Sequence, residues 1–534
     1  MTRRSAAVVA VAAAVLSYLP TLDNYFVQDD FGVVALLSSK PATYFPRWFV
    51  STWMEDIWGY TPDEIRPFPA VSYQIAAVFG AASPYANHVI NIAFHAVNTL
   101  LVLAVAVEAA GLALAPALVA ALCFAVLPMQ TESVAWITGR VDSMPACFFL
   151  AAFLLFVRWR TSHRARAYGW AVAWCAVALL SKQNAVILVP CLMAYDLVVG
   201  RRAVRPAWSW LRPYVPFIAL TVAYLALRYA LFGEVARESM LNDRQFAVFS
   251  ADLVVHLKRL VYGEPGVAMS GARLAAWVGA AAAATLVYAA WAEGRRAAPL
   301  AATAVFFGLV WIGLCVAPTL VAGYASPRHM YLASVGWAIL VALPVELLWR
   351  RETRAARWLA VAGAVAVLGV YSLQLQREVA QWDRRAEVSQ RIVHDLEGEA
   401  SRMPAGTLVL AGAPRSSFDF AVPHAVRPPF TASDLTARLR VVTHSSIHCC
   451  PAHLWEPHTR SLLQAWQDDA THPPVVVLYW NADSGAVTRV DDAAQPFVRA
   501  LIPILRETRD VASLDATLLD VVEKLTGGRA ERQR

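Results

Sequence analysis

The chain has 534 residues, of which 58% are hydrophobic and only 16% are charged. Apolar runs long enough to cross a hydrocarbon layer of about 30 Å recur along it, and no pattern of alternating strands appears, so we expect a polytopic membrane protein of helices rather than a barrel. The formal net charge of +7 does not indicate a nucleic-acid partner, because the arginines cluster in the loops between the apolar runs.

These basic clusters predict how the spans are oriented. The sequences "RWRTSHRAR", "GRRAVR", "EGRR" and "RRETRAAR" follow the fourth, sixth, eighth and tenth apolar runs. Positive loops mark the cytoplasmic side, so all four clusters are expected inside. About 11 transmembrane helices result, among them spans at about 5–22, 86–109, 112–127, 143–157, 213–232 and 357–373. The composition suits a multi-pass protein of the bacterial cytoplasmic membrane.

The apolar runs and the change in composition after them predict a division of the chain into three segments. Residues 1–375 form the transmembrane domain, with an outer loop at about 23–70, and 376–400 form a helical connector. Residues 401–534 contain the strand-like runs "GTLVLAG", "LRVVTH" and "PPVVVLYW" and are expected to be a soluble extracytoplasmic α/β or α+β domain.

The outer loop contains an aromatic pattern and an acidic pair. Four aromatic residues recur at the spacing of one helical face, which predicts a helix lying in the membrane interface: Phe45, Trp48, Phe49 and Trp53. Asp29 and Asp30 come directly after the first span. They are either a solvated cap or candidates for a general base or metal ligand, since a low dielectric and a like-charged neighbour both raise the proton affinity of a carboxylate.

Charged residues also occur in the other loops on the predicted outer side. The set comprises Arg66, Glu132, Arg140, Asp142, Lys182 and Arg328. Surface ion pairs and snorkelling to headgroups are the structural alternatives. A phosphate leaving group in the membrane would need such cations.

Two further polar groups have both structural and functional interpretations. A stripe along the second span is formed by His88, Asn91, His95 and Asn98; interhelical hydrogen bonds are favoured for it over a polar cavity. The segment 444–458, "HSSIHCCPAHLWEPH", gathers histidines and cysteines without a recognised zinc spacing, so an ordinary loop is favoured over a metal site.

The order of these motifs resembles the GT-C superfamily of polytopic glycosyltransferases. It is most similar to the membrane half of the transmembrane and TPR-containing O-mannosyltransferases and their bacterial relatives. The likeness extends over residues 24 to about 392, and its motifs are "QDD", "RPFPAVSYQ", "NHVINIAFHAVNTLL", "LPMQTESVAWITGRVD", "SKQN", "SPRHMYLASVG" and "QWDRRAEVSQ". Two departures are the replacement of the family's His-Pro-x-His-Thr-Glu by Leu-Pro-Met-Gln-Thr-Glu at 127–132 and the absence of the repeat domain.

The resemblance implies a GT-C-like fold and an inverting transfer of a sugar, with mannose as a candidate. The donor would be a polyprenyl-phosphate-linked sugar and the acceptor a hydroxyl of a protein or glycan on the outer face. Asp29 and Asp30 are then the implied catalytic acids, with Asp29 the better match. Arg140, Lys182 and Arg328, and less directly Arg66, are candidates to hold the phosphate.

Glu132 and Asp142 are candidates to orient the sugar or the acceptor. A divalent metal is a candidate cofactor, with Asp30 and Glu132 as candidate ligands. Two other classes stay open: a lipid or solute transporter, and a noncatalytic membrane scaffold that displays the C-terminal domain. A transporter is expected to show internal repeats and mid-membrane charges, whereas these charges lie at the outer ends of spans.

Overall fold

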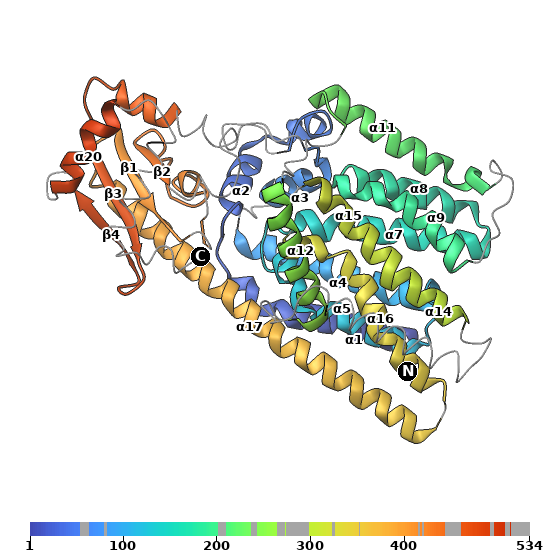
Figure 1. Cartoon of the computed structure of the whole chain (residues 1–534). Helices are drawn as coiled ribbons and strands as arrows, with labels where there is room; N and C mark the ends of the chain where they lie inside the picture. The colour runs from blue at the N-terminus through green and yellow to red at the C-terminus, as the bar shows by residue number, and fades with distance from the viewer. Residues whose placement is uncertain are drawn as a thin grey trace. The chain divides into compact units, whose positions relative to one another are not determined.

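A computed structural model describes residues 1–53, 64–78, 83–200, 210–235, 243–263, 298–322, 326–351, 353–414, 417–418, 421–443, 461–491 and 496–507, and the single residues 273 and 513. The chain divides into two compact units (Figure 1). The first comprises Met1–Thr21, Asp63–Pro69 and His88–Ala380, and the second comprises Leu22–Pro62, Ala70–Asn87 and Gln381–Arg534. The predicted outer loop is therefore grouped largely with the C-terminal residues.

The first unit is helical. Its longer helices are α1 (Arg3–Tyr18), α4 (Pro84–Glu108), α5 (Leu114–Val126), α7 (Arg140–Ser162), α8 (Ala165–Leu179), α9 (Leu188–Val198), α11 (Val215–Phe232), α12 (Asp243–Tyr262), α14 (Ala298–Val305), α15 (Ile312–Ala322), α16 (Ala333–Trp349) and α17 (Arg354–Ala400). The start of α4, up to Asn87, and the end of α17, from Gln381, are grouped with the second unit. Helix α7 packs against α8, and α5 packs against both α1 and α16. Short helices make the turns: η3 (Pro128–Gln130), α6 (Thr131–Val134), η4 (Gln183–Ile187), η5 (Arg212–Tyr214), the π-helical η7 (Phe306–Trp311) and η8 (Pro327–Met330).

The apolar runs of the sequence became membrane-length helices. In the described part of the chain six helices are long and apolar enough to cross a membrane, or up to seven if the bent pair Leu114–Val126 and Pro128–Val134 is one span. Two shorter apolar helices, Gln183–Val198 and Ala333–Trp349, accompany them. The chain is thus a multi-pass membrane protein. The count of 11 spans stays a prediction, and the eighth predicted span lies outside the described residues.

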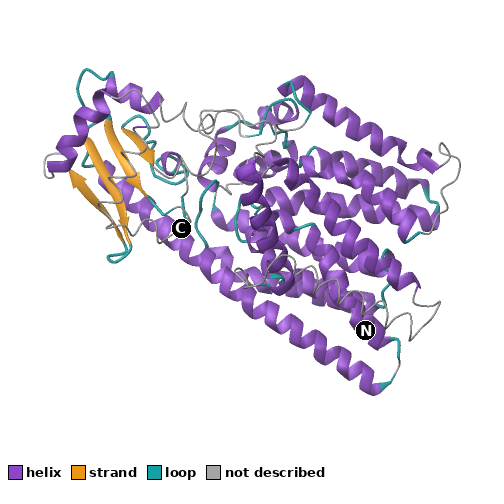
Figure 2. Ribbon diagram, viewed as in Figure 1, coloured by secondary structure: helices purple, strands orange, loops and turns teal. Residues whose placement is uncertain are grey.

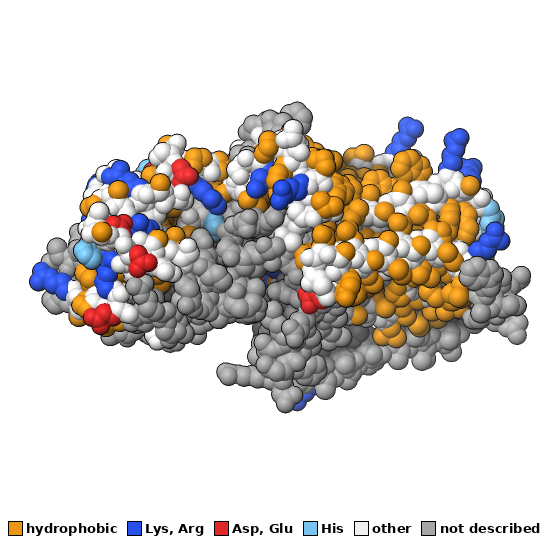
Figure 3. Space-filling view, turned by 90° about the horizontal axis from the view of Figure 1, so that it is seen from above, with side chains coloured by type: hydrophobic (Ala, Val, Ile, Leu, Met, Phe, Trp, Pro, Cys, Tyr) orange, Lys and Arg blue, Asp and Glu red, His pale blue; other side chains and the backbone are white. Residues whose placement is uncertain are grey.

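Large hydrophobic side chains are exposed on the outer surfaces of these helices. Figure 3 shows hydrophobic side chains gathered over one face of the helices. Over all faces, the exposed ones include Val8, Leu16, Trp170, Val222, Leu309, Trp358, Val365 and Leu373. A soluble protein rarely exposes so large an apolar surface, whereas lipid tails solvate it without cost. The surface therefore supports membrane embedding independently of helix length.

The strands that the structure describes all belong to the second unit (Figure 2). Four strands, β1 (Thr407–Gly412), β2 (Leu439–Thr443), β3 (Val475–Asn481) and β4 (Ala486–Asp491), form one sheet in the order β2-β1-β3-β4. β1 pairs in parallel with β2 and β3, and β3 pairs antiparallel with β4. The three strand-like runs of the sequence are thus present, and β4 is an addition. The extracytoplasmic location of this part stays a prediction.

A hydrophobic core covers one face of the sheet. Leu408 and Leu410 of β1 and Val475 and Val477 of β3 point to the same face, as alternate residues of a strand must. They pack against Trp466 and its buried neighbours Leu463 and Leu505. The last of these belongs to helix α20 (Pro496–Glu507), and η9 (Val422–His424) lies between β1 and β2 in the chain.

The segment after the first span folds differently from the expected interfacial helix. It contains α2 (Asp30–Ser39), η2 (Ala42–Phe49) and, later, α3 (Pro67–Val78). Trp48 and Trp53 are buried, and Trp48 Nε1 donates to Gln74 Oε1 at 3.0 Å. The predicted helical face lying in the membrane interface does not include these two tryptophans, because their rings pack inside the unit.

Candidate active site

The polar stripe of α4 holds the loop that precedes α7. Asn91 is fully buried and donates from Nδ2 to Trp136 O at 2.8 Å, while its Oδ1 accepts from Arg140 Nε at 2.8 Å. The turn is tight at Gly139, where a Cβ would lie 2.1 Å from the carbonyl oxygen of Glu132. Only glycine therefore allows the backbone at position 139 to approach that of Glu132 so closely.

The same stripe holds the loop that precedes α16. His95 Nε2 lies 3.1 Å from Ala125 O, which can only accept, so the ring proton is on Nε2 and Nδ1 accepts from the hydroxyl of Tyr331 at 2.9 Å. The Tyr331 oxygen in turn accepts from Asn98 Nδ2 at 3.0 Å. The predicted interhelical hydrogen bonds are confirmed for Asn91, His95 and Asn98. Helix α4 thus fixes two loops that are distant in sequence.

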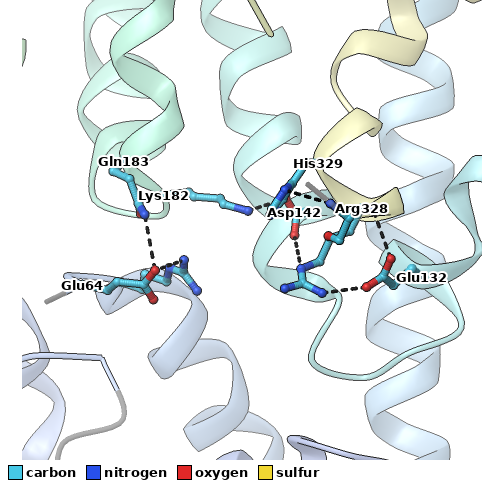
Figure 4. A network of polar contacts seen from close by, with 9 residues as sticks. Glu64, Glu132, Asp142, Lys182, Gln183, Arg328 and His329 are labelled. Carbon is cyan, nitrogen blue, oxygen red and sulfur yellow. Dashed lines mark hydrogen bonds and ion pairs between the residues drawn. The ribbon is translucent and has the colours of Figure 1, made fainter. Parts of the chain in front are cut away.

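These loops bring four predicted residues into one network (Figure 4). Arg328 Nη1 donates to Glu132 Oε1 at 2.6 Å, and the Arg328 backbone N–H donates to Glu132 Oε2 at 3.2 Å. Arg328 Nε lies 3.7 Å from Asp142 Oδ2, and Lys182 Nζ donates to Asp142 Oδ1. Each residue comes from a different element: Glu132 from α6, Asp142 from the first turn of α7, Lys182 from the turn after α8, and Arg328 from η8. All four side chains are at least four-fifths buried.

A second group of polar contacts joins Glu64 and Arg66 to Gln183, the residue after Lys182. Arg66 Nη2 donates to Glu64 Oε1 at 2.8 Å, and Gln183 Nε2 reaches the same oxygen at 3.3 Å. Gln183 follows Lys182 directly, so the residues before α3 are tied to the turn that carries Lys182 (Figure 4). Glu64 was missed by sequence reasoning; its only signal was an acid two residues before Arg66.

Among the residues that the structure describes, equal numbers of positive and negative charges take part in these ion pairs. Three cations, Arg66, Lys182 and Arg328, face three carboxylates, Glu64, Glu132 and Asp142. Removing this many charges from water is expensive, and ionisable groups kept in membrane proteins are therefore functional candidates. Arg140, the remaining predicted phosphate ligand, is fully buried with its guanidinium bonded to α4.

His329 completes the η8 end of the network. Burial, together with the charges of Lys182 and Arg328, holds the pKa of this imidazole well below its usual value. Its Nδ1 accepts from the Ser326 backbone N–H at 3.3 Å, which requires an unprotonated nitrogen. A neutral His329 thus fixes the turn that carries Arg328.

The acidic pair belongs to the second unit, and its two members differ. Asp30 is the first residue of α2, is buried, and accepts from the Val27 N–H at 3.1 Å. Asp29 is only partly buried and makes no capping hydrogen bond to the helix. Asp30 therefore stabilises the start of α2, whereas Asp29 is the more accessible carboxylate.

The described residues do not present a metal site. No group of three or more His, Cys, Asp or Glu side chains among them is arranged to hold a metal ion. Asp30 is engaged with Val27 and Glu132 with Arg328, so neither is placed as part of a ligand set. Segment 444–458 lies outside the described residues.

Comparisons with known proteins agree with the motifs. Residues 68–239 match the family described as dolichyl-phosphate-mannose-protein mannosyltransferase. The protein O-mannosyl-transferase TMTC3 of Mus musculus is 29% identical over 211 residues, which cover 37% of this chain and 22% of that protein. TMTC1 of Mus musculus is 31% identical over 160 residues, covering 29% of this chain and 17% of that protein. The chain thus matches less than a third of the length of these relatives.

Solved structures resemble the chain over almost all of its length. ArnT from Cupriavidus metallidurans, bound to undecaprenyl phosphate, has a TM-score of 0.50 and 15% identity and covers 90% of this chain and 94% of its own. The oligosaccharyltransferase AglB from Archaeoglobus fulgidus, in complex with an inhibitory peptide and a dolichol-phosphate, has a TM-score of 0.50 and 12% identity, covering 91% and 74%. The resemblance to the GT-C membrane glycosyltransferases is therefore confirmed: the chain has their fold and is similar in sequence to the protein O-mannosyltransferases.

Proposed function

We propose that the chain is an inverting glycosyltransferase that moves a sugar, with mannose as the candidate, from a polyprenyl-phosphate carrier to an acceptor hydroxyl of a protein or glycan. The observation that carries this proposal is the buried network of Arg66, Lys182 and Arg328 with their carboxylate partners. Two solved structures with this fold contain a polyprenyl or dolichol phosphate. On the predicted topology the network lies at the outer ends of the spans, so transfer is proposed at the outer face.

The network suits a phosphate leaving group because its cations are already gathered and desolvated. Arginine meets phosphate oxygens through two parallel N–H groups, and lysine supplies a point charge. A phosphate would take over hydrogen bonds that Glu132 and Asp142 now accept from Arg328 and Lys182. The carboxylates released in this way are then available to sugar or acceptor hydroxyls.

The chemical step is a displacement at the anomeric carbon. The acceptor oxygen forms the new bond while the bond between the anomeric carbon and the phosphate oxygen breaks, and the polyprenyl phosphate leaves with that electron pair. We assign the acceptor proton to Asp29, since it is the more exposed member of the acidic pair. General base catalysis of this kind contributes roughly 10²–10⁴-fold.

The test is the transfer of labelled sugar from polyprenyl-phosphate donors by the purified full chain. We expect transfer by the wild type and its loss in Arg328→Gln. Arg160→Gln is the matched control, because Arg160 is also a buried arginine paired with a buried carboxylate, that of Asp196, in the same unit. Loss of transfer in Arg328→Gln alone supports the proposal.

Three outcomes would contradict it. Equal activity of Arg328→Gln and the wild type would remove the network from the reaction. Movement of intact donor across the membrane without release of sugar would favour a transporter, and absence of any donor consumption would favour a scaffold.

A further inference from the structure

The turn that carries Asp29 is held by residues almost 400 positions later in the chain. Gln28 has a left-handed backbone, with φ of 53°, and its N–H donates to Ser417 O at 2.7 Å. The Ser389 hydroxyl donates to Phe26 O at 2.5 Å. Both hydrogen bonds lie within the second unit, and they fix the backbone on the N-terminal side of the acidic pair.

Aromatic packing fixes the other side of the pair. Phe31, the residue after Asp30, stacks on Phe418 with a centroid distance of 4.9 Å and an interplanar angle of 11°. It also meets Phe430 edge-on at 4.8 Å, and Phe26 meets the same ring at 5.0 Å. Phe26, Phe31 and Phe418 are at most 2% exposed. The first turn of α2 therefore cannot rotate about its axis without breaking a buried ring stack.

These contacts come from the segment that follows β1, which is part of the C-terminal sheet domain. We propose that Ser417, Phe418 and Phe430 are positioning residues for the Asp29 carboxylate, so that the C-terminal domain is needed for the chemical step. This inference rests on the proposed function and gives the C-terminal domain a role in it. A displacement of about 1 Å in a catalytic group can reduce turnover roughly 10²-fold, which is the size of effect such contacts control.

The experiment compares Phe418→Leu with Leu463→Ala in the full chain. Leu463 is equally buried in the same unit but belongs to the core of the sheet, so its truncation reports general loss of stability. We expect Phe418→Leu to lower kcat by about 10- to 100-fold with an unchanged KM for donor and acceptor. Leu463→Ala should leave kcat unchanged at temperatures at which both variants are folded.

Hydrogen exchange of residues 24–39 gives a readout that does not depend on activity. Phe418→Leu should speed exchange in this segment, and Leu463→Ala should not. Gln28→Pro removes the N–H donated to Ser417 and excludes a positive φ, so it should reproduce the kcat loss. Gln28→Asn keeps the N–H and tolerates the left-handed backbone, so it should retain most of the activity.

The outcomes separate the two proposals. Unchanged exchange in Phe418→Leu would overturn the positioning contact whatever the activity. Faster exchange with full kcat would show that the turn is held but that holding it does not serve catalysis. A selective rise in acceptor KM would replace positioning by acceptor binding. If the wild type transfers no sugar, the proposed function is wrong, and so is the proposed role in catalysis. Hydrogen exchange of residues 24–39 still tests whether Phe418 holds the turn.

Discussion

Lys182 donates to Asp142 Oδ1 although the two residues are 40 positions apart in the chain. Asp142 also faces Arg328 at 3.7 Å, so one carboxylate stands between two cations from different loops. The carboxylate lowers the cost of burying both cations, which otherwise repel each other. The Lys182–Asp142 pair is consequently the centre of the network. Substitution of Lys182 and substitution of Asp142 should have different effects on stability.

Lys182→Met should abolish transfer yet cost less stability than Asp142→Leu. Asp142 retains Arg328 as a partner when Lys182 is removed, whereas loss of Asp142 leaves Lys182 buried without its carboxylate. Breaking a buried pair in that way costs about 3–5 kcal/mol. Thermal unfolding of the two variants in detergent, alongside the transfer assay, measures both effects. Equal stability of the two would mean that Arg328 does not compensate Asp142.

The acidic pair should separate into a catalytic and a structural member. Asp29→Asn should lower kcat by about 10²–10⁴-fold, because it removes the proton acceptor. Asp30→Ala should lower the free energy of unfolding by about 0.5–2 kcal/mol, since it deletes the acceptor for Val27 N–H. Asp30→Asn keeps an acceptor oxygen and is the control. Full activity of Asp29→Asn would assign the base elsewhere.

Much of this arrangement was predictable because it depends on local patterns. The apolar runs predicted the helices, and the basic loops placed Arg66, Glu132, Asp142, Lys182 and Arg328 on one side of the membrane. Side chains at the same ends of packed spans are expected to lie close together, so no long-range pairing needs to be known to predict their contact. Glu64 was not found, since two adjacent acids in the short sequence "DEIRPF" have no periodicity that distinguishes either from an exposed charge.

Other features could not be read from local patterns. The packing of Phe31 on Phe418 joins segments that are almost 400 residues apart, and a single sequence records no such pairing. Strand β4 was missed because "AVTRVD" is short and polar, as suits a strand paired on one side. The difference between Asp29 and Asp30 depends on where α2 begins, and helix boundaries are the least certain part of sequence-based reading.

Tyr331→Phe should weaken the network without touching a charge. The substitution removes the hydroxyl that binds His95 Nδ1 and Asn98 Nδ2. Asn98 Nδ2 keeps its hydrogen bond to Ser143 O, but the buried His95 Nδ1 loses its donor, at a cost of about 1–3 kcal/mol. Because Tyr331 follows Arg328 and His329 closely, the donor KM should rise as well. Unfolding and donor titration measure the two effects. A loss of stability with an unchanged KM would limit this tyrosine to helix packing.

Stability should fall as pH is lowered through the titration of His329. Its pKa is lowered in the folded protein from an ordinary value of 6.5, so the unfolded chain binds the proton first as pH falls. Unfolding is therefore favoured progressively below about pH 6.5. His329→Asn, which keeps an acceptor for the Ser326 N–H, should flatten the dependence of Tm on pH between 7 and 5. An identical slope in wild type and variant would show that other groups dominate.

The equal numbers of cations and carboxylates in the described ion pairs predict opposite effects at Glu64 and Arg66. Glu64→Gln removes one of three carboxylates and releases Arg66 from its ion pair, so a donor phosphate should meet a net positive site and bind more tightly. Arg66→Gln should weaken donor binding, since it leaves Glu64 to repel the phosphate. A tenfold change in either direction corresponds to about 1.4 kcal/mol. Donor titrations at low and high salt measure both, with the larger difference expected at low salt because salt screens charges that water can reach. Weaker binding in both variants would mean that the Glu64–Arg66 pair shapes the loop before α3 rather than setting the charge that the donor meets.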